Sequence, residues 1–141
     1  MNPANVTSSG SLVRASSRNG AMIAAGPGLK PGQGQRGEVT IVNLGALPAA
    51  FRLHERSASN DFAAGRLGLA IQELGESARR RVFLGEIGAM PAEGIDLGRF
   101  EAGESRTYRF TVMLAKDTPA EELDRAADAV YEWLAASAGG R

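Results

Sequence analysis

The 141-residue chain is long enough for one domain with its own core, and its formal net charge is zero, with 16 basic and 16 acidic residues. This balance excludes the basic excess that is typical of nucleic-acid-binding proteins, and the absence of cysteine excludes disulfides and thiolate metal sites. No apolar run approaches the roughly 18 residues of a membrane helix, so we expect no membrane span.

Residues 1–18 are predicted to form a flexible arm, because they are rich in Ser, Asn and Gly. The arm contains a small apolar element made of Val6, Leu12, Val13 and Ala15. Such a segment cannot fold alone, but it could add as a strand to an exposed sheet edge, with these side chains facing the acceptor's core. Two alternatives remain open from the residues: a disordered tail, or a first strand that pairs within its own subunit.

A turn and an alternating strand follow the arm. Pro31 and Gly32 predict the turn, because proline pre-sets φ and glycine accepts a positive φ. Val39 and Ile41 then recur at every second position, which is the pattern of a strand with one buried face. Gly45, in an Asn-Leu-Gly corner, is expected to end this strand with a positive φ.

Further short strands are predicted along the rest of the chain. Tyr108 and Phe110 belong to the cleanest alternation and, with Trp133 further on, are expected to anchor the core through their large apolar area. Gly103 is expected to shape the turn before that strand. The predicted strands are residues 21–25, 36–44, 51–54, 66–72, 81–87, 95–100 and 107–114. Several short strands separated by turns predict an all-β sandwich or barrel.

The last third of the chain supports two interpretations. Residues 118–121 have the pattern of a capping box with proline at the first helical position, and a helical stripe of apolar residues follows. Periodicity alone therefore favours one helix over residues 119 to about 136. The alternative is a short helix to residue 127 followed by a strand. In that strand the inward-facing residues are Ala129, Tyr131, Trp133 and Ala135.

No motif for catalysis or cofactor binding stands out. His54 is the only histidine, and a zinc site usually needs three or four ligands, so we expect no metal, no cofactor and no catalytic residue. The glycine-rich residues 26–37 match neither a dinucleotide-binding fingerprint nor a P-loop, and we interpret them as turns between strands. The basic residues 79–81 are interpreted as a solvated strand start, with a polyanion or partner contact as the alternative.

Several motifs occur in a fixed order between residues 19 and 136. They are LKPG before the strand GEVTIVNLG, then LGRFEAGESRTYRFTV, and then the closing stretch VYEWLAAS with Trp133. This order resembles the secreted TasA/camelysin-type β-sandwich family, particularly a branch found in high-GC Gram-positive bacteria. The resemblance implies a jelly-roll-like β-sandwich of about seven to nine strands, with a short helix near residues 119–127. It also reverses the local preference at the C-terminus, in favour of the strand.

The resemblance implies a division of the chain and a function. Residues 1–18 become the N-terminal arm and candidate donor strand, residues 19–137 the sandwich domain, and residues 138–141 a C-terminal tail. In such fibres each subunit lends its N-terminal segment to the next, which is strand addition by a head-to-tail contact. The expected protein is an extracellular filament or biofilm-matrix subunit whose leader peptide has been removed. Its main partner is a second copy, with other matrix or cell-surface components as further candidates.

Two other functions remain as alternatives. The first is a monomeric surface or adhesion module that binds protein or glycan through its loops, for which residues 57–65 and 88–94 are the candidates. The second is a camelysin-like protease, which we do not expect, because the chain has no zinc-ligand motif.

Overall fold

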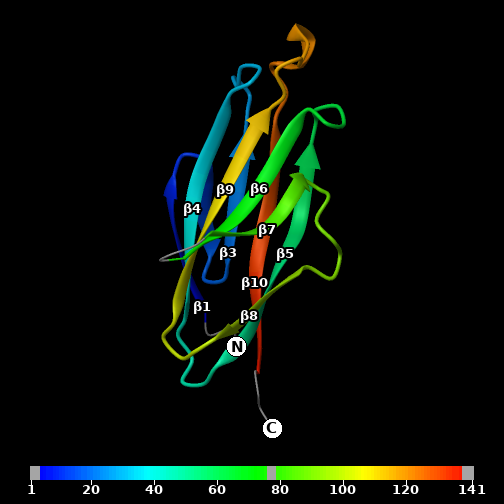
Figure 1. Ribbon diagram of the computed structural model, residues 1–141. Coiled ribbons are helices and arrows are strands. Elements are labelled where there is room, and N and C mark those ends of the chain that lie inside the picture. Colours follow the sequence, from blue (N-terminus) through cyan, green and yellow to red (C-terminus); the bar gives the residue numbers. More distant parts are fainter. Residues whose placement is uncertain (1–3, 76–78, 138–141) are drawn as a thin grey trace.

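The computed structural model describes residues 4–75 and 79–137, and these are almost entirely β-structure (Figure 1). The described residues form ten strands, one more than the upper end of the predicted range. They are β1 (Ala4–Gly10), β2 (Val13–Ser17), β3 (Gly20–Ala25), β4 (Gly34–Asn43), β5 (Ala49–Asn60), β6 (Leu67–Leu74), β7 (Arg79–Glu86), β8 (Ile95–Phe100), β9 (Ser105–Leu114) and β10 (Ala127–Ser137). The prediction of an all-β fold is confirmed.

The strands form two five-stranded antiparallel sheets, in the orders β1-β4-β9-β6-β7 and β2-β3-β10-β5-β8. Without β1 and β2, the remaining eight strands have the orders 4-9-6-7 and 3-10-5-8. This is the strand order of an eight-stranded jelly roll, and the predicted architecture is therefore confirmed. The first two strands are additions to the same side of that jelly roll, one on each sheet.

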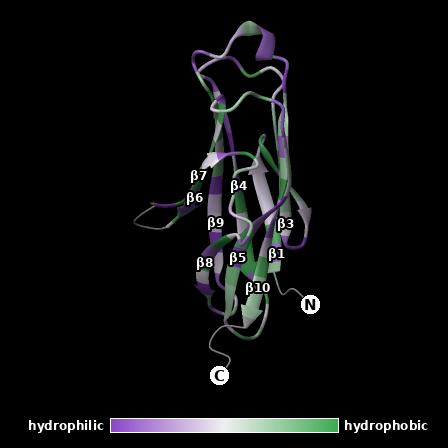
Figure 2. Ribbon diagram, turned by 90° about the vertical axis from the view of Figure 1, so that its right-hand side faces the viewer, coloured by the Kyte–Doolittle hydropathy of each residue, from purple (hydrophilic) through white to green (hydrophobic). Residues whose placement is uncertain are grey.

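The core lies between the two sheets, and alternate residues of the central strands fill it. Tyr108, Phe110 and Trp133 are fully buried there, and the Phe110 and Trp133 rings meet edge to face with centroids 6.3 Å apart. Tyr131 packs against Phe110 at 5.3 Å. In Figure 2, hydrophobic segments lie along β5 and β10 in the body of the sandwich. The three aromatic positions expected to anchor the core are thus placed at its centre.

The N-terminal arm is not free of the sandwich in this structure. Residues 4–17 form β1 and β2, which pair with β4 and β3 of the same chain. The expectation of a flexible arm is wrong for these residues, because edge strands expose one side to solvent and so tolerate a polar composition. Residues 1–3, at the start of the arm, and the predicted tail at residues 138–141 lie outside the described residues.

The predicted helix near residues 119–127 is reduced to η1 (Ala120–Glu122), a single 3₁₀ turn. The capping box does not form, because the Thr118 hydroxyl donates to the Ala115 carbonyl at 2.6 Å instead of capping the turn. The chain from Ala127 onward is β10, which pairs with β3 on one side and β5 on the other. Two neighbouring strands thus override the helical periodicity, and the strand interpretation of this region is correct.

Asn43 fixes the corner after β4. Its side-chain Nδ2 donates to the carbonyls of Leu47, Phe100 and Glu101 at 3.1–3.3 Å, and its Oδ1 accepts from the Gly45 amide at 3.0 Å. Of the predicted turn glycines, Gly32 beside Pro31 has φ +80° and Gly103 has φ +78°. The positive φ expected at Gly45 is wrong, because the fully buried Asn43 side chain shapes this corner without it.

Candidate functional site

The candidate site is the N-terminal strap, by which we mean residues 4–17, together with the sheet edges that it covers. β1 runs along β4 with a register from Ala4 opposite Asn43 to Gly10 opposite Gly37. The chain then crosses from one sheet to the other, and β2 runs along β3. In Figure 1 the strap lies in dark blue along one side of the sandwich. It therefore covers β4 and β3, and β1 and β2 become the edge strands of the two sheets on that side.

All four predicted donor-strand residues face the core, but it is the core of their own chain. Val6, Leu12 and Val13 are buried, with 6%, 2% and 5% of their surface exposed, and Ala15 packs against the same core half-buried. The arrangement is the intramolecular alternative that the sequence left open. A residue that sequence reasoning missed is Ala4, which is fully buried at the start of β1. Its position two residues before Val6 was the available signal.

β1 is held mainly by its backbone. Seven residues pair with β4, but only Ala4 and Val6 are buried, whereas Thr7, Ser8 and Ser9 are exposed. A hydrogen bond links the two strands of the strap, since the Ser8 hydroxyl accepts from the Ala15 amide at 3.0 Å. Backbone hydrogen bonds to a sheet edge depend little on the side chains of the added strand. A strand held in this way could therefore pair with the same edge of another copy.

The crossover depends on Gly10. This residue has φ +91°, and a Cβ added to it would lie 2.8 Å from the Cα of Gly37 and 3.0 Å from the Arg36 carbonyl oxygen. Only glycine fits both the backbone conformation and the close approach. After the exposed Ser11, Leu12 is buried, and its carbonyl accepts from the Ala24 amide at 3.3 Å.

The N-terminal part of the sequence, which includes the strap, is basic. Residues 1–37 contain no Asp or Glu, and their four basic residues, Arg14, Arg18, Lys30 and Arg36, are all exposed. The rest of the chain therefore carries an acidic excess of four, although the whole is neutral. The first carboxylate, Glu38, accepts from Arg109 at 2.8 Å on the outer face of the sheet.

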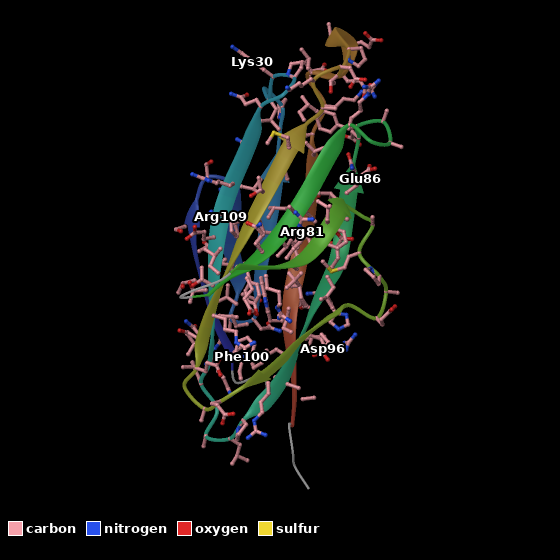
Figure 3. The ribbon with its side chains drawn as sticks, viewed as in Figure 1. Lys30, Arg81, Glu86, Asp96, Phe100 and Arg109 are labelled. Carbon is pink, nitrogen blue, oxygen red and sulfur yellow. The ribbon has the colours of Figure 1, made fainter. Side chains whose placement is uncertain are left out.

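The predicted basic cluster lies on the opposite edge of the same sheet. Arg81, on β7, shares a row with Gln72 and Arg109 across the outer face, where Figure 3 labels both arginines. Arg81 is exposed, which agrees with a solvated strand, whereas Arg80 is paired with Glu73 at 3.3 Å. Of Arg79, only the backbone at the start of β7 is described.

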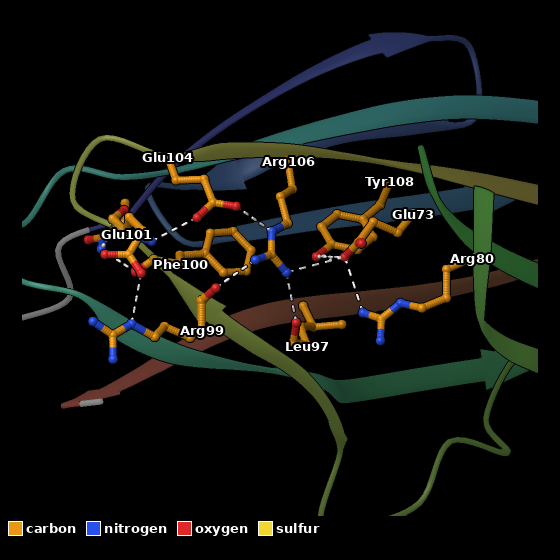
Figure 4. A network of polar contacts seen from close by, with 10 residues as sticks. Glu73, Arg80, Leu97, Arg99, Phe100, Glu101, Glu104, Arg106 and Tyr108 are labelled. Carbon is orange, nitrogen blue, oxygen red and sulfur yellow. Dashed lines mark hydrogen bonds and ion pairs between the residues drawn. The ribbon is translucent and has the colours of Figure 1, made fainter. Parts of the chain in front are cut away.

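On this β7–β8 side, charged side chains rather than a strand connect the two sheets. Arg106 of β9 donates to the carbonyls of Leu97 at 2.9 Å and Arg99 at 2.6 Å, both on β8, and to Glu104 at 2.8 Å (Figure 4). Its guanidinium lies 4.1 Å from the centroid of the Phe100 ring. The two sides of the sandwich are thus closed by different means.

Glu104 is held as a carboxylate. Burial alone would raise its pKa, but the Glu101 amide, which donates at 2.8 Å, and the Arg106 guanidinium outweigh burial, and the pKa of Glu104 is lowered from its ordinary value. The arrangement is structural, because every partner of this carboxylate belongs to the turn or to the adjoining strand.

The two tyrosine hydroxyls are also bonded to carboxylates. Tyr108 donates to Glu73 and Tyr131 donates to Glu55, each at 2.8 Å. Burial, and then the neighbouring carboxylate, raise the pKa of both tyrosines well above the ordinary value. Glu55 also accepts from the Gly88 amide at 3.0 Å. These hydroxyl and carboxylate groups satisfy one another's hydrogen bonding within the sandwich.

The candidate binding loops and the histidine lie apart from the strap. Residues 57–60 belong to β5, so the first predicted loop is confined to the residues after Asn60, whereas residues 88–94 do connect β7 to β8. His54 lies on β5, half-buried. Within residues 4–75 and 79–137, no group of three or more His, Cys, Asp or Glu side chains could hold a metal ion. In the same residues, no helix has the length and apolar character to span a lipid bilayer.

Comparisons with known proteins give structural similarity only. A scan against protein-family models finds no match, and neither does a search of curated proteins. AvmM, which catalyses macrocyclization in alchivemycin A biosynthesis, has a TM-score of 0.35 and 15% identity, over 74% of this chain and 69% of that chain. The PapD-like domain 7 of human CEP192 has a TM-score of 0.36 and 12% identity, over 99% and 88%.

A third solved structure, TmCBM61 in complex with β-1,4-galactotriose, has a TM-score of 0.37 and 9% identity, over 96% of this chain and 89% of that chain. At such TM-scores none of these similarities carries an argument about function. The function must be argued from the strap and the edges that it covers.

Proposed function

We propose that the protein is a non-catalytic structural subunit of an extracellular filament, of the biofilm-matrix or cell-surface kind. It polymerises head to tail by donating its N-terminal strand to the sheet of the neighbouring subunit. One observation carries the proposal: β1 is added to the edge of a jelly roll that already has its eight strands. The resemblance of the sequence motifs to TasA/camelysin-type proteins supports the same function.

The mechanism is an exchange of equivalent contacts. Every backbone pair that β1 makes with its own β4, from Ala4 opposite Asn43 onward, can form with the β4 of a second copy. The exchanged form therefore has the same β1–β4 contacts as the monomer. The equilibrium between the two depends on protein concentration. Because the donor and acceptor surfaces of one chain differ, each copy can accept a strand from one neighbour and donate its own to another, and such a head-to-tail contact generates a fibre when it does not close on itself.

Negative-stain electron microscopy of the purified protein, with and without residues 1–16, tests the proposal. The intact chain should form filaments and the truncated chain should not. Monodisperse monomers of the intact chain over a wide concentration range would overturn it. Two full-length variants separate strand donation from loss of chain: Val6→Asp places a charge at a buried position and should abolish filaments, whereas Thr7→Asp, at an exposed position of the same strand, should retain them.

A monomeric surface module is the second candidate, and a specific observation favours it. The strap pairs within its own chain, so in a single copy residues 37–43 of β4 are already covered. Such a module would bind protein or glycan through the loops after Asn60 and at residues 88–94. Binding that survives Val6→Asp, in the absence of filaments, would identify this function.

A further inference from the structure

We infer that only β1 is exchanged between copies, with a hinge at Gly10 and Ser11, and that β2 stays in its own subunit. This inference rests on the proposed function and makes it specific. The acceptor is the β4 edge of a second copy, from Gly37 to Asn43. Of the predicted donor residues, only Val6 then packs on the second copy, whereas Leu12, Val13 and Ala15 stay in the core of their own subunit.

The first reason is the connection between β2 and β3. Only Arg18 and Asn19 separate the two strands, and Ser17 pairs with Gly20 across this hairpin. Asn19 is also tied to β10, because its carbonyl accepts from the Trp133 amide at 2.8 Å. Release of β2 would have to open this two-residue turn and break its contact with the central strand of the sheet.

The second reason is where the apolar contacts lie. Leu12 and Val13 are buried at the crossover, and Leu12 is also bonded to Ala24, so they hold the start of β2 in place. On the N-terminal side of the crossover, β1 contributes only Ala4 and Val6 to the core. Less apolar surface must be exposed to release β1 than to release the whole strap.

The third reason is the conformation of Gly10. In the self-paired chain Gly10 has a φ of +91° and lies close to Gly37. Residues other than glycine rarely adopt this backbone conformation. An opened hinge that continues the strand no longer needs the positive φ, although Gly10 still pairs with Gly37, now that of the second copy. The residue identity at position 10 therefore sets the balance between the closed monomer and the exchanged form, as is general for hinge loops in strand swapping.

The edge itself has room for an opened hinge. β4 begins at Gly34, but β1 covers it only from Gly37, so residues 34–36 have no partner strand on that side. Continuation of the antiparallel register places Ser11 of an incoming strand opposite Arg36. The same three residues also line a shallow hollow together with Thr111 and Met113 of β9, the neighbour of β4 on its other side.

Cysteine crosslinking tests the inference cleanly, because the chain contains no cysteine. Full-length Thr7→Cys chains are mixed with tagged Thr40→Cys chains, and Arg14→Cys chains with tagged Met22→Cys chains. Thr7 is opposite Thr40 across β1–β4, and Arg14 is opposite Met22 across β2–β3. Oxidation under assembly conditions should give the heterodimer from the first pair only.

The two ways of failing are distinguishable. Equal heterodimer from both pairs means that the whole strap is donated, which overturns the inference and leaves the proposed function standing. Heterodimer from neither pair, under conditions that give an intrachain crosslink in a Thr7→Cys/Thr40→Cys double variant, overturns strand donation itself.

A hinge variant provides a second measurement. Gly10→Ala should raise the yield of the first heterodimer roughly tenfold at a fixed protein concentration, because the positive φ of the closed form is strained for alanine and an extended hinge is not. Gly65→Ala is the matched control, since Gly65 also has a positive φ of +82° but lies in a turn before β6, with no atom within 4 Å of the added Cβ. An unchanged yield with Gly10→Ala, or the same increase with Gly65→Ala, would overturn the hinge.

Discussion

Gly10 and Gly37 face each other across β1 and β4 so closely that neither position has space for a side chain. A Cβ on Gly10 would lie 2.8 Å from the Gly37 Cα, and a Cβ on Gly37 would lie 3.0 Å from the Ser9 carbonyl and from Val13. The glycine pair therefore sets how tightly the strap can lie on the sandwich. It also allows the two halves of the contact to be perturbed separately.

Gly37→Ala should loosen the strap without disturbing the rest of the sheet. Gly37 has no positive φ, so the substitution acts through crowding of Ser9 and Val13 alone, with an expected loss of about 1–3 kcal/mol. Amide exchange should become faster in residues 4–10 and remain unchanged in β9. Gly68→Ala is the control, because its nearest neighbours lie at 3.8 and 4.0 Å. Equal effects of the two substitutions would contradict this account of the strap.

Trp133→Ala should destabilise the whole domain. Trp133 is the largest of the fully buried side chains that the structure describes, and its ring packs against those of Tyr108 and Phe110. Its removal therefore leaves a large cavity between the sheets. We expect a loss of roughly 3–5 kcal/mol in the free energy of unfolding, measured by urea denaturation. A loss below about 1 kcal/mol would contradict the placement of Trp133 at the centre of the core.

Arg106→Met should separate the two sheets on the β7–β8 side. The substitution keeps the aliphatic packing but removes three hydrogen bonds to Leu97, Arg99 and Glu104, and we expect a loss of about 2–4 kcal/mol. Arg99→Met is the control. The Arg99 ion pair with Glu101 has both side chains more than half exposed, so its removal should change the stability by less than about 1 kcal/mol. Similar losses for both variants would refute the bridging role of Arg106.

Alkaline pH should unfold the protein before its tyrosines ionise in the folded state. The chain has two tyrosines, Tyr108 and Tyr131, and burial beside carboxylates raises both folded pKa values above the unfolded value of about 10. The corresponding stability is fully present below about pH 10 and declines as the pH rises further, because the unfolded chain releases these protons first.

Phenolate absorbance followed together with circular dichroism tests this order of events. Absorbance should rise only when the β-sheet signal is lost, and Tyr131→Phe should remove about half of its amplitude. Reversible ionisation near pH 10 with an intact β-sheet signal would show that the hydroxyls are accessible in the folded protein.

Much of the sandwich could be predicted because its central strands alternate cleanly. Tyr108, Phe110 and Val112 of β9 recur at every second residue and are all buried, so period two alone locates the strand and its inner face. β10 shows the limit of this reasoning. Tyr131 and Leu134 also fit a helical stripe, and only the pairing of this segment with β3 and β5, which is not local in sequence, decides for the strand.

The strap could be predicted less well for a physical reason. An edge strand buries few side chains, and in β1 these are Ala4 and Val6, so the apolar pattern is too short to distinguish a strand from a polar tail. The roles of Gly10 and Gly37 depend on a contact between segments 27 residues apart, which no local pattern encodes. The hydrogen bonds of Asn43 could not be predicted either, because two of its three carbonyl partners, Phe100 and Glu101, lie far away in the sequence.

The placement of donor and acceptor on one chain has a consequence for growth. In a filament built by strand exchange every junction is the same antiparallel β1–β4 pair, so the assembly is polar. One terminus presents an empty β4 edge, and the other presents a β1 without a host. A chain that lacks β1 can occupy only one of these termini, so small amounts of it should stop elongation in a single direction.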